Sequence, residues 1–168
     1  CNKIFEINGY IVGASMLIKK EVFEDIGLFD ENYFMWAEEA DLCFRALKNN
    51  WKLFYCGYSN IYHKEGNTTG KGDYVSLFGK TKIRPTYQRF IITGYLDVRN
   101  HLYFVKKNYN VILMYIYMIL TLPNLLKRTI GIILYDDKKI KRMKLLYKGI
   151  YDGIFNKMQT PKELNGNE

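Results

Sequence analysis

The segment GLFDENYFMWAEEADLCFRA, residues 27–46, decides how this chain folds. Apolar side chains at positions 36, 40, 43, 44 and 47 follow the period of an α-helix, which predicts a helix over residues 36–49. Asp41 and Arg45 stand four residues apart and are expected to pair on the solvent-facing side of that helix. Glu38 and Glu39 then fall in its first turn.

Two explanations account for the adjacent carboxylates of Glu38 and Glu39. The helix dipole and the free backbone N–H groups favour carboxylates in a first turn, which is a sufficient structural reason for them. A helix start that is merely solvated does not need an aromatic lead-in, however, and residues 33–36 provide one. The pair is therefore also a candidate for acid or base catalysis.

Strands and a short helix are expected around this segment. Residues 5–18 are predicted to form one or two strands, with glycines where the backbone is approached closely. Residues 20–26 are predicted to form a helix closed by Gly27, since glycine tolerates a left-handed C-terminal cap. Residues 51–56 and 60–62 are predicted to form strands.

Several motifs follow one another along residues 7–105. They are GASMLI (13–18), VF (22–23), IGLFDE (26–31), YFM (33–35), EEADLCFRA (38–46) and YHK (62–64). In this order they resemble the acceptor-side half of family 2 glycosyltransferases, in particular the rhamnosyltransferase-like members. KGIYDG (148–153) is similar to that family's tail. The resemblance implies an α/β fold, namely the C-terminal half of a GT-A type nucleotide-diphospho-sugar transferase, followed by a C-terminal helical extension.

The resemblance also implies catalytic roles for the acidic cluster. The second member of the family's acidic pair is usually the base, so Glu39 is expected to take the acceptor proton, with Glu38 and Asp41 as neighbours. The family often has aspartate at this position, and glutamate keeps the chemistry but extends its reach by one methylene. Gly13 and Ala14 are expected beside the donor sugar and its phosphates. A core strand whose glycines make a bulge is the alternative for that segment.

Two further positions are implied to serve the departing diphosphate. His63 is expected to ligate Mn²⁺ or Mg²⁺, with the other ligands in an Asp-x-Asp motif that this chain lacks. A surface or hydrogen-bonded histidine is the alternative. Arg99 is expected to bind the diphosphate, because a guanidinium offers two hydrogen bonds to phosphate oxygens. A helix-surface ion pair is the alternative there.

Residues 65–86 lack periodicity and are rich in turn formers. A loop that closes over the nucleotide sugar and a plain surface excursion are both compatible with that composition.

Three cysteines without C-x-x-C spacing indicate neither a disulfide framework nor a zinc site, and they fit a reducing, cytoplasmic setting. Since the first residues already enter a strand, the chain is expected to be a fragment that lacks the donor half.

The last third of the chain is strongly basic. Residues 1–100 hold 13 Lys/Arg and 12 Asp/Glu, whereas residues 101–168 hold 12 Lys/Arg and 5 Asp/Glu, a net charge of +7. Residues 111–120 are all apolar, which falls short of the roughly 20 residues of a transmembrane helix. Residues 139–154 follow with apolar side chains at 140, 143, 147, 150 and 154 and with basic residues between them. Such a helix suits a membrane surface or packing on its own domain. No nucleic-acid-binding motif accompanies the charge.

The predicted organisation is a glycosyltransferase half over residues 1–105, a basic helical extension over 106–158 and a frayed tail over 159–168. The implied activity is transfer of a sugar, with inversion, from a nucleotide diphosphate to a hydroxyl of a surface-polysaccharide or lipid-linked glycan precursor. The expected location is the inner face of the cell membrane, with nucleotide-sugar donor and glycan acceptor as partners. The alternative is a non-catalytic module that binds glycans or membranes or assembles subunits, including a homo-oligomer.

Overall fold

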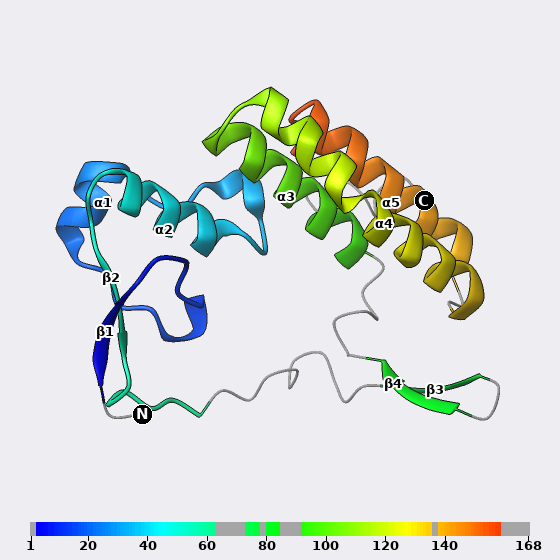
Figure 1. Ribbon diagram of the computed structural model, residues 1–168, viewed down its shortest axis with the longest axis horizontal. Helices are drawn as coiled ribbons and strands as arrows, with labels where there is room; N and C mark the ends of the chain where they lie inside the picture. Colours follow the sequence, from blue (N-terminus) through cyan, green and yellow to red (C-terminus); the bar gives the residue numbers. More distant parts are fainter. Residues whose placement is uncertain (1–2, 63–72, 78–79, 85–91, 136–137, 159–168) are drawn as a thin grey trace. The chain divides into compact units, whose positions relative to one another are not determined.

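The computed structural model describes residues 3–62, 73–77, 80–84, 92–135 and 138–158 (Figure 1). For residues 73–77 and 80–84 it describes the backbone alone. The chain separates into two compact units, residues 1–64 and residues 65–168, and each is described by itself.

The first unit contains one small antiparallel sheet. Strand β1 (Ile4–Ile7) pairs with β2 (Leu53–Cys56), so that Ile7 lies opposite Leu53. The strand predicted within residues 51–56 is confirmed. The prediction for residues 5–18 is correct only at its start, because Gly13–Ser15 form a 3-10 turn, η1. Residues 60–62 are not in a strand, contrary to prediction. A β-prone run becomes a strand only where a second strand pairs with its backbone N–H and C=O groups. In this sheet, β1 pairs with Leu53–Cys56 and not with residues 60–62.

Two α-helices and a second 3-10 turn follow η1 in the described part of the first unit. Helix α1 (Lys20–Ile26) has its predicted bounds, and the N–H of Gly27 closes it on Phe23 O at 3.0 Å. Gly27 has φ 78° and ψ 175°, an extended conformation that only glycine adopts readily rather than the predicted left-handed helical one. The turn η2 (Glu31–Tyr33) and helix α2 (Glu38–Lys48) follow.

The core of the first unit lies between α2 and the sheet. Cys43 and Ala46 of α2 are buried against Leu53 of β2, and partly buried apolar side chains surround them: Ile7, Ile11, Met16, Val22, Ile26, Leu47 and Trp51. Trp51 also donates its indole N–H to Asp25 Oδ2 at 2.7 Å, which joins the end of α2 to α1. This core fixes α2 against the segment that contains η1.

The second unit begins with a β-hairpin. Strands β3 (Asp73–Leu77) and β4 (Lys80–Arg84) are antiparallel, with Asp73 opposite Arg84. The prediction of an irregular excursion over residues 65–86 is therefore wrong for these two segments. Turn formers dominate residues 66–73, whereas the paired strands include β-prone Tyr74, Val75 and Ile83.

The other described residues of the second unit form three helices that lie side by side in Figure 1, followed by a short C-terminal stretch. They are α3 (Thr93–Asn108), α4 (Val111–Tyr135) and α5 (Lys139–Ile154). Asn110 caps α4, because its Oδ1 accepts the N–H of Leu113 at 2.8 Å. The helix then continues through Pro123 for 25 residues. By length and composition alone it could cross a membrane, so the prediction that this segment is too short is wrong.

Two glycines bring α3 and α5 into backbone contact. An added Cβ at Gly149 would lie 2.6 Å from Tyr95 O, and one at Gly153 would lie 3.0 Å from Arg99 O. Between them, buried Asp152 accepts a hydrogen bond from Tyr95 Oη at 2.9 Å. Burial and that hydrogen bond raise the pKa of Tyr95 to about 12. The segment KGIYDG, noted in the sequence, is thus the part of α5 that packs on α3.

Helix α5 buries a different face from the predicted one. The buried residues are Leu146, Gly149, Asp152 and Gly153, whereas Ile140 and Tyr147 are exposed. Glycine has no side chain for a periodicity argument to detect, which explains the error.

The predicted domain boundary at residue 105 falls inside α3, while the compact units divide after Lys64. The GT-A assignment stays a prediction.

Candidate active site

The loop before α2 has an unusual backbone. Phe34, Trp36 and Ala37 have φ values of 62°, 67° and 72°, which non-glycine residues rarely adopt and which cost about 1–3 kcal/mol each. Trp36 and Ala37 therefore cannot continue the helix, and α2 begins at Glu38, two residues later than predicted. Phe34 and Met35 are exposed. A strained loop with exposed apolar side chains thus leads directly into the acidic pair.

Glu39 contacts the glycine segment that the resemblance, not the residues themselves, assigned to the donor. Its Oε1 accepts the backbone N–H of Gly13 at 3.2 Å. One helical turn further on, Cys43 Sγ accepts the N–H of Ile11 at 3.5 Å. The two contacts lay residues 11–13 along the first turns of α2. Ala14 lies in the same 3-10 turn, η1, as Gly13. Gly13, Ala14 and Glu39 are therefore neighbours, although 25 or more positions separate them in the sequence.

Glu38 differs from Glu39 in its surroundings. Its Oε2 is buried without a hydrogen-bond partner in the part of the chain that the structure describes. Burial raises the pKa of the Glu38 carboxyl, the backbone N–H of Glu38 opposes that rise, and the neighbouring Glu39 carboxylate adds to it. Both glutamates lie in the first turn of α2, as predicted.

We expect Glu38→Gln to stabilise the first unit at neutral pH and to have no effect below the ordinary carboxyl pKa of 4.5. Because folding raises the pKa of Glu38, the folded state binds more protons than the unfolded state just above pH 4.5, so stability falls as pH rises through that window. Glutamine carries no charge and escapes this loss. Both tryptophans, Trp36 and Trp51, lie in the first unit, and their fluorescence reports its Tm. A Tm difference that is the same at every pH would contradict the expectation.

Asp41 is buried in a hydrogen-bond network. It accepts Tyr33 Oη at 3.1 Å and Arg45 Nε at 2.9 Å, and its side chain is completely buried. The predicted pairing with Arg45 is confirmed, but its predicted place on the solvent side is wrong. Arg45 also donates to the carbonyls of Ile26 and Leu28, the latter at 2.8 Å. The network joins α2 to the end of α1 and, through Tyr33, holds the strained loop. Asp41 therefore positions the acidic pair.

The sequence did not single out Tyr33 as a site-forming residue. Its side chain is completely buried, and its hydroxyl reaches Asp41 across eight positions. A buried tyrosine hydroxyl in an apolar segment needs a polar partner, and Asp41 stands eight positions further along the chain. That was the signal in the sequence.

Arg99 lies in the second unit and is completely buried. Its Nε donates to Asn100 Oδ1 at 2.8 Å, and its guanidinium lies 5.4 Å from the centre of the Tyr95 ring. The alternative of a helix-surface ion pair is not what the structure shows. In this structure, backbone atoms of Arg99 lie against Gly153, where α3 packs on α5. Its binding to a diphosphate stays a prediction.

His63, the predicted metal ligand, lies outside the described residues. Among the residues that are described, no group of three or more His, Cys, Asp and Glu side chains could hold a metal ion. The described part of the site therefore does not fit a metal centre by itself, and Mn²⁺ or Mg²⁺ dependence stays a prediction from the resemblance.

Parts of the chain are similar to a curated rhamnosyltransferase and a curated hexosyltransferase. Over 63 residues, the chain is 33% identical to N-acetylglucosaminyl-diphospho-decaprenol L-rhamnosyltransferase of Mycobacterium tuberculosis. These residues are 38% of this chain and 20% of that protein. Over 88 residues, the chain is 31% identical to the low-salt glycan biosynthesis hexosyltransferase Agl10 of Haloferax volcanii. These residues are 52% of this chain and 24% of that protein. No family model and no solved structure matches the chain.

Part of this chain is thus similar to glycosyltransferases. The similarity supports a general role in glycosyl transfer. The matched segments span 20% and 24% of the lengths of those relatives, so donor, acceptor and stereochemistry belong to the proposal that follows.

Proposed function

We propose that this chain forms the acceptor-side part of a GT-A type glycosyltransferase that transfers a sugar, with inversion, from a nucleotide diphosphate to a hydroxyl of a cell-surface polysaccharide or lipid-linked glycan precursor. The observation that carries the proposal is the hydrogen bond between Gly13 and Glu39. The resemblance assigned one residue to the donor and the other to the base, and the fold makes them neighbours. The names of the two similar proteins point to the same class of reaction.

The proposed reaction needs one carboxylate in its basic form. The acceptor oxygen attacks the anomeric carbon from the face opposite the nucleotide diphosphate, while the bond from that carbon to the diphosphate oxygen breaks. The proton of the acceptor hydroxyl passes to the carboxylate of Glu39, which acts as general base. Inversion follows from the attack on the opposite face. Asp41, Tyr33 and Arg45 contribute by holding α2 and its preceding loop in place.

The loop before α2 suits the acceptor side of such a site. Phe34 and Met35 are exposed shortly before Glu38, and the positive φ values of Phe34 and Trp36 keep this segment out of the helix. Backbone strain of this kind persists only where the surrounding structure enforces it, and it concentrates at functional sites. A site with no function gives no reason to maintain it.

The direct test is a transfer assay on the protein expressed from its complete reading frame. A panel of nucleotide-diphosphate sugars is incubated with lipid-linked acceptors, and release of the nucleoside diphosphate and the anomeric configuration of the product are measured. We expect release that depends on acceptor and a product of inverted configuration. A retained configuration would contradict the single-base mechanism.

We expect Gly13→Ala to impair transfer without lowering stability. The new Cβ would lie 2.6 Å from Glu39 Oε1, and that carboxylate is the movable end of a flexible side chain. The Tm should therefore change little, whereas displacement of the base by about 1 Å should lower kcat by roughly 10- to 100-fold. Gly9→Ala is the matched control, because a Cβ there meets nothing within 4 Å. Equal kcat values for Gly13→Ala, Gly9→Ala and the native protein would separate Glu39 from catalysis.

A further inference from the structure

Helix α4 carries an apolar face that is exposed in the described second unit. Its members recur at helical spacing on one side of the helix, and Ile112, Ile119 and Leu120 are 68%, 70% and 72% exposed. The face consists of Ile112, Ile116, Ile119, Leu120, Leu126, Ile130 and Leu134, and we call it the α4 apolar face. A surface helix of a protein surrounded by water carries polar residues on this side. The composition of α4 therefore calls for an apolar environment.

The opposite side of α4 is already occupied. Met114 is completely buried, and Arg128 pairs with Asp97 of α3 at 2.6 Å. Thr129 Oγ1 lies 3.3 Å from the Tyr147 hydroxyl of α5. Since α3 and α5 contact this inner side, the α4 apolar face is the side of the helix that points away from them in the described part of the unit.

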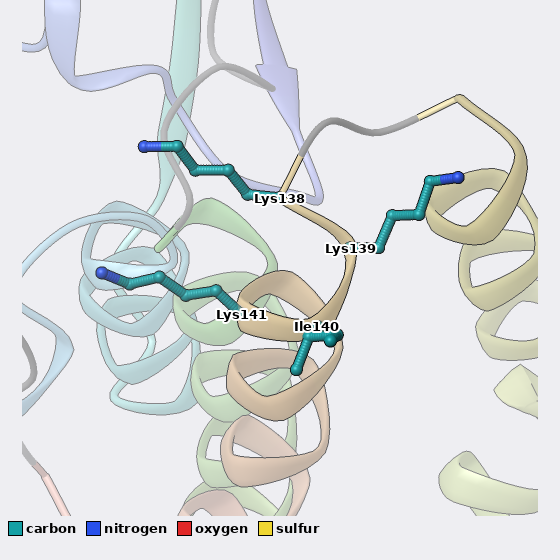
Figure 2. A pocket seen from close by; sticks show the side chains of 4 residues that line it. All are labelled: Lys138, Lys139, Ile140 and Lys141. Carbon is teal, nitrogen blue, oxygen red and sulfur yellow. The ribbon is translucent and has the colours of Figure 1, made fainter.

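Cations gather where α5 begins, next to the C-terminal end of α4. Lys138, Lys139 and Lys141 surround a hollow of about 320 Å³ together with Ile140, which is 73% exposed (Figure 2). In the figure, Lys138 and Lys141 extend to one side and Lys139 to the other. A specific phosphate site needs donors that converge, which these do not. Their arrangement suits attraction to an extended anionic surface. Lys144 follows on the exposed side of α5.

We propose that α4 and the start of α5 bind the surface of an anionic lipid bilayer, with α4 lying in the plane of the interface. An apolar helix face with adjacent lysines has the composition of an interfacial helix. The net charge of +7 over residues 101–168 complements anionic headgroups, whereas it would oppose association of two copies through the same surface. Tyr115 lies among the exposed side chains of α4, and tyrosine favours the headgroup level.

The contacts of α4 favour lying on the bilayer over crossing it. The helix is about 37 Å long at 1.5 Å per residue, enough to cross. However, α3 runs beside it and is tied to it by the pair of Asp97 and Arg128. A crossing helix would take these charges, and Lys127 beside them, into the hydrocarbon, where charged groups are costly. In the interface plane the apolar face is buried and the pair of Asp97 and Arg128 stays hydrated. Lys127, which helical spacing places between Ile116 and Leu120 on that face, can extend its ammonium group to the headgroups.

The test is co-sedimentation of the protein with vesicles. We expect it to sediment with mixed phosphatidylglycerol and phosphatidylcholine vesicles at low salt, not with pure phosphatidylcholine vesicles, and to be largely released at about 0.5 M salt, where the Debye length is roughly 4 Å. The assay needs no transfer activity, so its outcome is independent of the proposed function. Equal binding to the neutral vesicles would overturn the electrostatic part of the proposal.

Two variants locate the binding surface. Reversing Lys139, Lys141 and Lys144 to Glu should weaken vesicle binding by about 100-fold or more, since each cation near an anionic leaflet contributes about fivefold. Reversing Lys3, Lys19 and Lys48 to Glu changes the net charge equally, but on exposed positions of the first unit, and should weaken binding far less. Equal weakening by both variants would overturn the assignment to α5.

The apolar contribution has its own variant. Replacing Ile112, Ile119 and Leu120 by Ser should lower binding by about 10-fold or more at every salt concentration, because exposed side chains lose membrane contacts but no core contacts. The helical circular dichroism should remain that of the native protein. A protein that ignores anionic vesicles at low salt and runs as a discrete dimer would overturn the proposal and assign the α4 apolar face to a subunit interface.

Discussion

Glu39→Gln is expected to lower the rate of sugar transfer by about 10²–10⁴-fold while the affinity for the nucleotide-sugar donor stays nearly unchanged. Glutamine has the same shape as glutamate, and its Oε1 can still accept the N–H of Gly13, so the contact at 3.2 Å survives. What is lost is the ability to take the acceptor proton. Single-turnover kinetics measure the rate, and calorimetric titration with the donor measures the affinity.

The control for this prediction is Glu21→Gln. Glu21 also lies in the first turn of a helix, α1, but no positive φ precedes it. If carboxylates at these positions only complement the helix dipole, both substitutions should cost roughly 0.3–1 kcal/mol of stability and leave transfer intact. A loss of transfer confined to Glu39→Gln separates catalysis from helix stabilisation.

The neighbouring Glu38 provides the competing assignment. The raised pKa of Glu38 makes its carboxylate a stronger base than an ordinary glutamate once it is ionised, but the proton leaves only at a higher pH. Transfer that survives Glu39→Gln and disappears with Glu38→Gln would reverse the order of the pair. Such a result would leave the reaction class intact and move the base by one residue.

Elements with strong local signals were predictable. The end of α1 follows from Gly27, and the place of α2 follows from apolar spacing. The residue at which α2 begins could not be predicted in this way. The positive φ values of Trp36 and Ala37 depend on contacts such as the hydrogen bond from Tyr33 to Asp41. The spacing of Asp41 and Arg45 gave their pairing. It could not show that Arg45 also donates to the carbonyls of Ile26 and Leu28.

The sequence nominated candidate site residues but could not give their geometry. The sequence placed Gly13 and Glu39 in one reaction only through the resemblance, since nothing local links positions 26 residues apart. The face of α5 was predicted from apolar side chains, yet Gly149 and Gly153 decide it through the absence of a side chain. Arg99 is the clearest case, because a charged residue that is completely buried has no periodic signature.

Gly149→Ala is expected to lower the stability of the second unit by about 2–4 kcal/mol. The added Cβ would lie 2.6 Å from Tyr95 O and 3.1 Å from Tyr95 Cα, which are backbone atoms that cannot move aside. Helices α3 and α5 must therefore separate, and the buried hydrogen bond from Tyr95 to Asp152 must lengthen. The gain in helix propensity of alanine over glycine, about 1 kcal/mol, offsets only part of this cost.

The measurement separates the two units. Far-UV circular dichroism follows mainly α3, α4 and α5, the three longest helices described, and its Tm should fall by roughly 10–20 °C for a unit of this size. The tryptophan fluorescence of the first unit should keep its transition, because Trp36 and Trp51 are both there. Gly131→Ala on α4 is the matched control, since a Cβ there meets nothing within 4 Å and helix propensity alone should raise the Tm. If Gly149→Ala raised the Tm as Gly131→Ala does, α5 would not pack on α3 through its glycine face, and the buried place of Arg99 would lose its explanation.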